Sequence, residues 1–455
     1  MSFKIKQKTL AGCFTLLVEV LFISMINFDS SYKMWAIVSL LQLILNLFII
    51  WNMSNTKKIS FISFFVILTA IFHCGHVYIL GFNISGELNL NFSNYGSQHA
   101  QIGAFRYYLY SQILITFGIL ICNEFSKNKS NSCNVDMRKS SKILILLGFI
   151  PRLYVDIIRL IRGLAMGYVG VYSLYTPQII NTFAFFFDIG VIIALLQYKQ
   201  SKKGKLLFIG ILFYKCLSMI TGSRQENVGF LFIWLFIYFF LIRKVNIRSV
   251  LKFLCIFIVG LILIGTIGKT RGNGDFSLNT MMSFIDDTKI TNILGNFLGE
   301  FGSAFSSLVV PFQQSPSKVN FGFGKSYIVG LLSIIPLLVS KFPALANQTT
   351  YVSLYKGTTF FGGSMLGESY YNFGWFGLII LFIVGYIIKK TDIQMTKKVF
   401  HNYCTLDYIM AFVLAVTMLI FIRGYFTDMV QKTVWIYIVL TIINKIDCIS
   451  QNDKY

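Results

Sequence analysis

The basic residues of the chain fall into two types with different chemistry. A guanidinium group presents a planar fork of donors that binds phosphate or carboxylate through two hydrogen bonds at once, whereas a lysine ammonium is a point charge. The chain contains thirty lysines but only ten arginines. Seven of the arginines fall on the outer side of the topology derived below, at least five of them within a turn or two of the end of an apolar stretch, which indicates a site for an anionic ligand at the outer face. They are Arg106, Arg152, Arg159, Arg162, Arg224, Arg271 and Arg423.

One segment, PRLYVDIIRLIRG at 151–163, places two of these arginines beside an acid. Arg152, Asp156 and Arg159 recur at helical spacing and share one helix face. Such a face can hold a diphosphate while Asp156 orients the guanidinium groups. It can also be an internally paired helix surface, with each arginine neutralised by a nearby acid. Both interpretations remain open from the sequence.

Two short segments between apolar stretches repeat this pairing of arginine with acid. TGSRQEN at 221–227 contains Arg224 and Glu226, and FIRGYFTDMVQ at 421–431 contains Arg423 and Asp428. A hairpin turn is the simpler interpretation of each. As binding sites, both would present a guanidinium group and a carboxylate at the boundary of a membrane.

A third segment, GGSMLGESYYNFGWFG at 362–377, surrounds Glu368 with glycines that permit close approach of a ligand or of a neighbouring helix. A carboxylate followed by aromatic and amide side chains suits a sugar, because rings stack on its apolar face and polar groups bind its hydroxyls. Tyr371 and Asn372 are therefore candidate sugar-binding residues. Glu368 is the candidate base for a sugar hydroxyl, with Glu226 and Glu300 as rivals. Simple helix packing explains the glycines equally well.

The composition shows what kind of fold must position these residues. The chain has 455 residues, of which 55% are hydrophobic and 13% charged, with a formal net charge of +22. Soluble domains carry about 25% charged residues, so this is an integral membrane protein. Its basic residues lie in short runs between apolar stretches, as the positive-inside rule requires. Nucleic acid is therefore excluded as the partner.

Apolar stretches long enough to cross a bilayer recur along the chain. With the N-terminus in the cytoplasm, 24 basic residues, 21 of them lysines, fall on the inner side, so both termini are expected in the cytoplasm. The first stretch is longer than the apolar region of a typical signal peptide and lacks a clear small-residue cleavage site, so it is expected to remain as a span. The twelve expected spans are 9–28, 34–53, 59–82, 106–122, 143–163, 178–198, 206–221, 228–242, 250–268, 371–388, 403–422 and 430–446.

Two long loops fall on the outer side of this topology. The first, 83–105, is polar and rich in asparagine. The second, 269–370, contains two apolar parts, 291–312 and 326–343, that glycine and proline interrupt, and we expect them to be re-entrant or interfacial helices. The predicted fold is thus an all-α polytopic bundle of about twelve helices with a large outer loop. The three parts are an N-terminal membrane bundle at 1–268, an extracytoplasmic loop region at 269–370 and the C-terminal spans at 371–455.

Several polar residues lie inside the apolar stretches. His73 and His76 have no carboxylate nearby in sequence, so we expect hydrogen-bonded core histidines and no metal site. Charged side chains within spans are functional candidates by default. Because their positions are scattered, we expect structural ion pairs at the following four residues: Glu19, Asp188, Lys215 and Asp407.

In architecture and in the segments 221–227, 300–343, 362–377 and 421–428, the chain resembles the Wzy-type polysaccharide repeat-unit polymerases, which include the O-antigen, capsule and enterobacterial common antigen polymerases. Some members also carry an arginine, ten residues and a glycine in an outer loop, which Arg152 and Gly163 match. No second copy starts at Arg271. The resemblance implies a membrane-embedded, GT-C-like, inverting and metal-independent glycosyltransferase of the bacterial cytoplasmic membrane that needs no cofactor.

The implied reaction moves the growing glycan from undecaprenyl diphosphate to a sugar hydroxyl of the next lipid-linked unit at the outer face, and a chain-length regulator is a further implied partner. The outer arginines would stabilise the departing diphosphate. The residues assigned to it are Arg152, Arg159, Arg224, Arg271 and Arg423.

Two alternative functions share this ligand. A lipid-linked oligosaccharide flippase usually has an internal repeat and a cationic cavity reached from both sides, and the sequence contains neither a repeat nor an inner arginine cluster. An O-antigen ligase would differ only in its acceptor. A solute transporter would leave the long outer loop unexplained.

Overall fold

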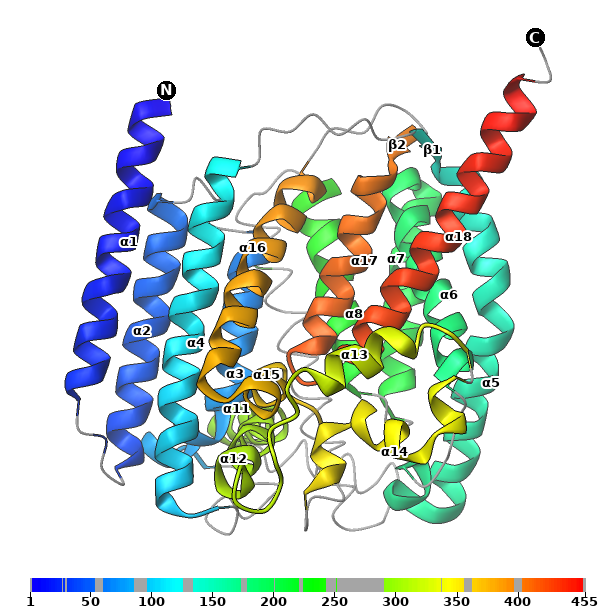
Figure 1. Cartoon of the computed structure of the whole chain (residues 1–455). Coiled ribbons are helices and arrows are strands. Elements are labelled where there is room, and N and C mark those ends of the chain that lie inside the picture. The colour runs from blue at the N-terminus through cyan, green and yellow to red at the C-terminus, as the bar shows by residue number, and fades with distance from the viewer. Residues whose placement is uncertain are drawn as a thin grey trace. The chain divides into compact units, whose positions relative to one another are not determined.

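A computed structural model gives the architecture of the chain (Figure 1). It describes residues 2–26, 28, 31–53, 60–85, 96–125, 134–172, 178–199, 201–220, 224–242, 251, 290–336, 338–355, 362–396 and 403–452. The chain divides into two compact units. Unit 1 comprises residues 1–129, 289–393 and 421–429, and unit 2 comprises 130–288, 394–420 and 430–455.

Unit 1 consists of membrane helices and of the short helices that follow residue 290. Apolar stretches form helices in a membrane because every backbone polar group must find a partner within the segment. Ser60 caps the third helix, since its hydroxyl accepts from the Ser63 N–H at 3.3 Å. The helices are α1 Ser2–Met25, α2 Tyr32–Met53, α3 Phe61–Gly81, α4 Gln98–Phe125, α11 Ile290–Gly302, α12 Ala304–Gln314, α13 Lys325–Leu332, α14 Pro343–Ala346, α15 Met365–Phe373 and α16 Leu378–Met395.

Unit 2 contains the remaining long helices and a small sheet. α5 is the longest, with 36 residues and Pro151 inside it, and it packs along α6. The turn between α17 and α18, residues 421–429, belongs to unit 1. The elements are α5 Met137–Tyr172, α6 Gln178–Tyr198, α7 Lys202–Ile220, α8 Arg224–Phe236, the π-helix η2 Ile237–Ile242, α17 Leu406–Phe421, α18 Phe426–Asn452 and the strands β1 Asn134–Asp136 and β2 Tyr403–Thr405.

Within the described residues, seven helices are long and apolar enough to cross a membrane, which confirms a polytopic helical membrane protein. Two shorter apolar helices, Glu226–Ile242 and Leu406–Phe421, coincide with further predicted spans. The seven segments are Gln7–Met25, Tyr32–Met53, Phe61–Gly81, Gln98–Cys122, Gln178–Tyr198, Met365–Met395 and Phe426–Ile446.

The prediction of twelve spans is confirmed only in part. The stretches 143–163 and 206–220 are helical, as parts of α5 and α7, but neither is among the seven segments. Stretch 143–163 contains several charged residues, and α7 begins with Lys202, Lys203 and Lys205. Apart from residue 251, the predicted span 250–268 lies outside the described residues.

Glycines allow two pairs of helices in unit 1 to touch backbone to backbone. A Cβ atom on Gly75 of α3 would lie 2.5 Å from the Leu298 carbonyl oxygen, and one on Gly302 would lie 2.4 Å from the His76 nitrogen. A Cβ on Gly118 of α4 would lie 2.1 Å from the Phe382 carbonyl oxygen. Side chains larger than hydrogen would force these helices apart, as in other small-residue contacts of membrane helices.

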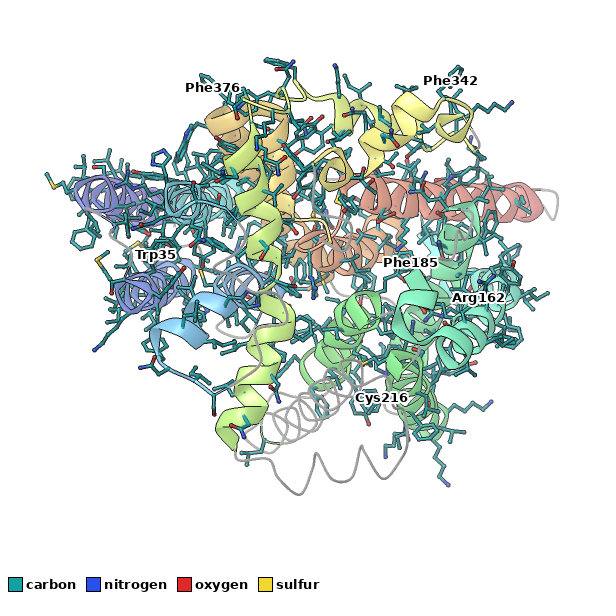
Figure 2. All side chains as sticks on the ribbon, turned by 90° about the horizontal axis from the view of Figure 1, so that it is seen from below. Trp35, Arg162, Phe185, Cys216, Phe342 and Phe376 are labelled. Carbon is teal, nitrogen blue, oxygen red and sulfur yellow. The ribbon has the colours of Figure 1, made fainter. Side chains whose placement is uncertain are left out.

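The short helices of unit 1 include the two stretches predicted to be re-entrant or interfacial. Stretch 291–312 forms α11 and most of α12, and stretch 326–343 contains α13 and the 3₁₀ turn Val339–Lys341. α12 and α15 lie at the end of the unit 1 helices opposite to the N-terminus of α1 (Figure 1). Near the start of α2, Trp35 (labelled in Figure 2) stacks on Phe105 of α4 with ring centroids 4.8 Å apart.

Besides its helices, unit 2 contains one small antiparallel ribbon among the described residues. β1 and β2 pair with the register Asn134 to Thr405, Val135 to Cys404 and Asp136 to Tyr403. Both strands precede long helices, α5 and α17. β1 lies in a loop that the sequence places in the cytoplasm, and β2 lies at the expected cytoplasmic end of the span 403–422. The pairing requires the two segments to lie on one side of the membrane, as that topology expects.

The register of the ribbon leads to a cross-linking prediction. In Val135→Cys, the new thiol faces Cys404 directly, and opposed residues in antiparallel strands have Cβ atoms about 5 Å apart, close to the reach of a disulfide. Oxidation with membrane-permeant iodine should therefore produce a disulfide-linked peptide pair that mass spectrometry detects. Val135→Ser is the control. A Val135→Cys protein without this cross-link would contradict the register.

Candidate functional site

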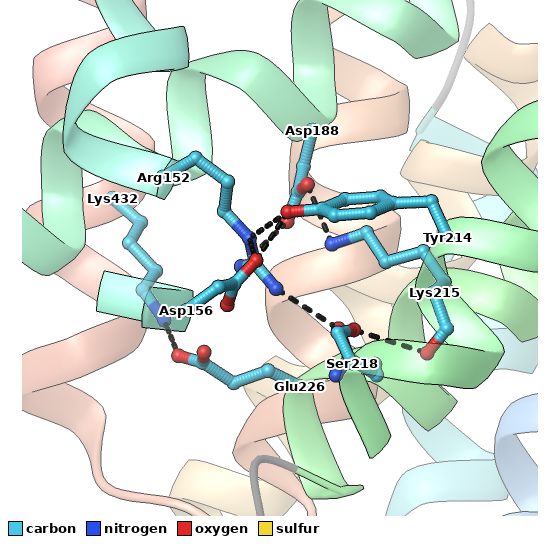
Figure 3. Close-up of polar contacts among 9 residues, drawn as sticks. Arg152, Asp156, Asp188, Tyr214, Lys215, Ser218, Glu226 and Lys432 are labelled. Atoms are coloured by element: carbon cyan, nitrogen blue, oxygen red, sulfur yellow. Dashed lines mark hydrogen bonds and ion pairs between the residues drawn. The ribbon is translucent and has the colours of Figure 1, made fainter. Parts of the chain in front are cut away.

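Unit 2 encloses a group of charged side chains that we call the charged cluster (Figure 3). Its members come from α5, α6, α7, α8 and α18, so that five helices meet through polar contacts inside an otherwise apolar bundle. Four are basic, three are acidic and two are neutral. They are Arg152, Arg159, Lys215, Lys432, Asp156, Asp188, Glu226, Tyr214 and Asn227.

Arg152 holds the centre of the charged cluster and is 3% exposed. Its Nε donates to Asp156 Oδ2 at 3.0 Å and to the Tyr214 hydroxyl at 3.1 Å, and Nη2 donates to Asn227 Oδ1 at 3.2 Å. Nη1 lies 3.7 Å from Asp188 Oδ2. The predicted helix face with Arg152 and Asp156 therefore exists, and in this state Arg152 is paired internally.

Lys215 and Asp188 form the most deeply buried ion pair of the cluster. Lys215 Nζ lies 2.6 Å from Asp188 Oδ1, and the two side chains are 0% and 4% exposed. The ammonium also lies 4.5 Å from the centroid of the Phe230 ring. The expected structural ion pair is thus confirmed for these two residues. A buried charge of this kind is tolerated only with its partner in place.

Glu226 and Arg159 lie toward the more open part of the cluster. Lys432 Nζ lies 2.5 Å from Glu226 Oε1, and the Glu226 side chain is 32% exposed. The Arg159 guanidinium group also attracts the Glu226 carboxylate electrostatically. Arg159 Nη1 is buried but has no hydrogen-bond partner among the described residues, so this guanidinium group retains donor capacity. Arg162, one turn further along α5, is exposed at the edge of unit 2 (Figure 2).

Glu368 lies at the centre of a second polar group, in unit 1. Ser364 caps α15 by accepting from the Gly367 N–H at 3.1 Å, which places Glu368 in the first helical turn. The Glu368 carboxylate is 0% exposed. Its Oε1 accepts from the Ser326 hydroxyl at 2.7 Å, and its Oε2 accepts from the Phe426 N–H at 2.9 Å. Glu368 therefore joins α15 to α13 and to the α17–α18 turn.

Asn372, one turn after Glu368, completes this polar group. Its Nδ2 donates to the Ser326 hydroxyl at 2.7 Å and to the Glu368 carbonyl at 2.8 Å. Its own carbonyl accepts from the Phe323 N–H at 2.8 Å. Asn372 is 0% exposed and positions Ser326 against Glu368.

Tyr371 belongs to a group of tyrosines beside α15. Its hydroxyl donates to Gln348 Oε1 at 2.8 Å, and its ring stacks on Tyr351 with centroids 5.8 Å apart. The Tyr351 hydroxyl donates to the Ser307 carbonyl at 2.9 Å. Burial raises the pKa of Tyr351 well above its usual value, so its hydroxyl keeps its proton and acts as a donor.

The segment before α15 contacts both a histidine and Arg423. A Cβ atom on Gly362 would lie 3.9 Å from Arg423 Nε, so Arg423 borders this segment. His73 Nδ1 lies 3.0 Å from the Thr69 carbonyl, which can only accept, so Nδ1 carries the proton. His73 Nε2 then accepts from the Ser364 hydroxyl at 2.9 Å. The expectation of a hydrogen-bonded core histidine is confirmed for His73.

The structure therefore sorts the predicted site residues into two groups, one in each unit. Arg152, Arg159 and Glu226 meet in the charged cluster. Glu368, Tyr371, Asn372 and Arg423 lie around α15. Arg224 and Glu300 lie in α8 and α11, but their side chains are outside the described part of the structure, and Arg271 lies outside the described residues altogether.

Sequence reasoning named Asp188 and Lys215 as intramembrane charges, but nothing in the sequence links them to Arg152. It missed the other contributors to these groups. Lys432 looked like one of many boundary lysines. Ser326 and Asn227 carry no signal at all, because short polar side chains are common in loops and at helix ends.

Comparisons with known proteins give a single finding. The family model described as O-antigen polysaccharide polymerase Wzy matches residues 11–453. A search of curated proteins and a search of solved structures found no match. The match extends over essentially every helix described above and confirms the resemblance stated from the sequence. The chain therefore belongs to the O-antigen polysaccharide polymerase Wzy family.

Proposed function

We propose that this polymerase transfers the growing glycan from undecaprenyl diphosphate to a sugar hydroxyl of the next lipid-linked repeat unit, at the outer face of the bacterial cytoplasmic membrane. In an inverting displacement, the acceptor oxygen bonds to the anomeric carbon as the bond to the diphosphate oxygen breaks. The acceptor hydroxyl loses its proton to a carboxylate, and the diphosphate leaves with the bonding electrons. Family membership supports polymerisation of lipid-linked units in a membrane.

The donor capacity of Arg159 is the observation that carries this proposal. Departure of a diphosphate develops negative charge, and preorganised cations stabilise it best. The charged cluster contains four basic side chains against three carboxylates, so one positive charge remains uncompensated within it. Arg159 Nη1 is buried and has no partner among the residues that the structure describes. A phosphate oxygen would supply the acceptor that this group lacks.

We assign the role of base to Glu368. Two donors, the Ser326 hydroxyl and the Phe426 N–H, fix one carboxylate oxygen each and so hold the group in one orientation. Because the side chain is fully buried, the acceptor sugar can reach it only after one of these contacts opens. Glu226, which is paired with Lys432, and Glu300 are the rival bases.

Deletion of the gene tests the function directly. Surface glycan from the deletion strain, separated on a gel, should contain single repeat units in place of the ladder of long chains. Re-expression of the wild-type protein should restore the ladder. Complete absence of surface glycan would instead indicate the flippase or the ligase and would reject the proposal.

The role of Arg159 leads to a substitution that keeps its charge. In Arg159→Lys, the point charge cannot reproduce the fork that binds two phosphate oxygens. Loss of charge-assisted hydrogen bonds worth about 1.5–3 kcal/mol should lower polymer formation roughly 10- to 100-fold at an unchanged protein level. Lys202→Arg, at the opposite end of α7 from Lys215, is the control and should leave the ladder intact. A normal ladder of long chains from the Arg159→Lys strain would show that the diphosphate does not bind at Arg159.

The outer location of the loop region is tested by thiol labelling. Ser317 is exposed in the turn after α12, and Ser201 is exposed before α7, in a loop predicted to be cytoplasmic. Ser317→Cys should react with a membrane-impermeant thiol reagent in whole cells. If the cells have an outer membrane, it is first made permeable to the reagent. Ser201→Cys should react only after lysis. The reverse pattern would invert the topology.

A further inference from the structure

Three membrane helices of unit 1, α1, α2 and α4, enclose a seam of polar side chains. None of these side chains belongs to the polar group around Glu368. The three helices pack against one another and stand side by side in Figure 1. Outside the seam, α1 exposes large apolar side chains such as Phe14, Leu21 and Phe22. The polar seam consists of Glu19 (6% exposed), Gln42 (5%), Asn46 (0%), Gln112 (2%) and Thr116 (0%).

Contacts between the helices show that these five residues lie close together. The Tyr32 hydroxyl donates to Gln101 Oε1 at 2.9 Å, and Gln42 Nε2 donates to the Leu109 carbonyl at 2.8 Å. α2 and α4 therefore run parallel, with residue 42 level with residue 109. One helical turn further along, Asn46 falls between Gln112 and Thr116.

α1 places its carboxylate at the same level. A Cβ atom on Gly12 would lie 2.9 Å from Leu120 Cδ1 and 3.2 Å from Met53 Sδ, so these three residues share one level. Glu19 lies seven residues further along α1, about 10 Å away at 1.5 Å per residue. Because α1 runs opposite to α2 and α4, this shift brings Glu19 level with Asn46. Its Oε1 indeed accepts from Gln42 Nε2 at 2.7 Å.

The polar seam contains many polar atoms whose bonding capacity is unused. Buried amide and hydroxyl groups normally have a hydrogen-bond partner, and leaving one without a partner costs about 1–3 kcal/mol. Within the described residues, six buried atoms of the seam have no such partner. They are Glu19 Oε2, Gln42 Oε1, Asn46 Oδ1 and Nδ2, Gln112 Nε2 and Thr116 Oγ1.

The charge of the seam indicates what would use this capacity. Glu19 has one hydrogen-bond partner, Gln42, and no basic partner among the residues that the structure describes, so the expected ion pair at Glu19 is absent there. A lone carboxylate inside a membrane bundle is costly unless a cation compensates it. One carboxylate neutralises a monovalent cation fully but would leave a divalent cation with a net charge.

We propose that the polar seam binds one alkali-metal cation between α1, α2 and α4. Glu19 Oε2 supplies the neutralising charge, and Gln42 Oε1, Asn46 Oδ1 and Thr116 Oγ1 supply neutral oxygen ligands of the kind that hard cations prefer. The amide of Gln112 lies next to them, and a half-turn of this amide exchanges its nitrogen for a further oxygen. The bound cation would fasten the outermost helix of this group, α1, to α2 and α4.

Direct binding to the purified full-length protein tests this site. In a choline buffer, ²²Na⁺ should bind saturably at one ion per chain, and unlabelled NaCl should displace it. Competition by KCl distinguishes a site that accepts both ions from one selective for Na⁺. Bound cation should also raise the unfolding temperature relative to choline chloride at equal ionic strength, because a ligand that binds only the folded state stabilises it.

Two variants and a control make the test specific. Glu19→Gln keeps an oxygen for Gln42 and should fold, but it should lose ²²Na⁺ binding and the rise in unfolding temperature. Asn46→Ala removes one ligand and should weaken binding at least about tenfold. Asp407→Asn, a carboxylate in α17, should bind as the wild type does. Absence of saturable binding of both ²²Na⁺ and the K⁺ analogue ⁸⁶Rb⁺ in the wild-type protein, or unchanged binding in Glu19→Gln, would overturn the proposal.

Discussion

Glu368→Gln is expected to lower the rate of glycan transfer by roughly 10²- to 10⁴-fold, the contribution of a positioned general base. The substitution keeps the size and shape of the side chain but removes its ability to take a proton from the acceptor hydroxyl. Binding of the lipid-linked donor should persist, because the donor diphosphate is assigned to other residues. Extension of lipid-linked repeats by the purified protein measures the effect.

The contacts of Glu368 show why this variant should still fold. The glutamine oxygen can accept from the Phe426 N–H, and its amide can donate to the Ser326 hydroxyl oxygen, which has a second lone pair. A thermal unfolding curve close to that of the wild type would establish that the loss is chemical. Glu226→Gln and Glu300→Gln are the matched variants. A Glu368→Gln protein that extends repeats at the wild-type rate would shift the role to one of those two residues.

Asp188→Asn is expected to have the largest effect on stability, about 3–5 kcal/mol, since breaking a buried pair leaves an uncompensated charge. The charge left behind is that of Lys215, whose side chain is 0% exposed and whose ammonium lies 2.6 Å from Asp188. The substitution also removes one of the two acidic neighbours of Arg152, since Asp188 Oδ2 lies 3.7 Å from Arg152 Nη1. Asp156 remains as the other. The unfolding temperature and the amount of folded protein in the membrane would both fall.

A second substitution separates this explanation from a general packing defect. Lys215→Met removes the stranded charge and fills similar volume, and replacing both members of a buried pair costs far less than removing one. The double variant Asp188→Asn, Lys215→Met should therefore be more stable than Asp188→Asn alone, with a coupling energy that a double-mutant cycle measures. Equal or lower stability of the double variant would show that the ion pair contributes little.

Features that depend on a continuous stretch of residues could be predicted from the sequence. The length and apolar character of a segment determine whether it forms a membrane helix, so seven of the twelve expected spans reappear as long apolar helices. The same local rule failed where charges interrupt the stretch, as in α5 with Arg152, Asp156 and Arg159. Arg152 and Asp156 are paired within the protein, so the helix tolerates charges that a lipid-facing helix would not.

Features that depend on contacts between distant segments could not be predicted. Ser326 and Phe426 lie 42 and 58 positions from Glu368, and neither residue type indicates that it would bind a carboxylate. Glu19 shows the converse error, because a charge inside an apolar stretch suggested an ion pair but the neighbouring helices supply amides and a hydroxyl. Which faces of two helices meet is decided by packing of the whole bundle, and hydropathy along one segment does not contain that information.

The ribbon of β1 and β2 has a consequence for the order of events during synthesis. Asn134 pairs with Thr405, 271 positions further along the chain. At a synthesis rate of about 5–20 residues per second, the first strand must wait roughly 15 to 50 seconds for its partner. Every described helix except α17 and α18 precedes the second strand in the chain, so the ribbon can close only when nearly the whole chain has left the ribosome. In a nascent chain halted before residue 403, β1 should therefore lack its partner strand and be able to pair with a strand of another chain.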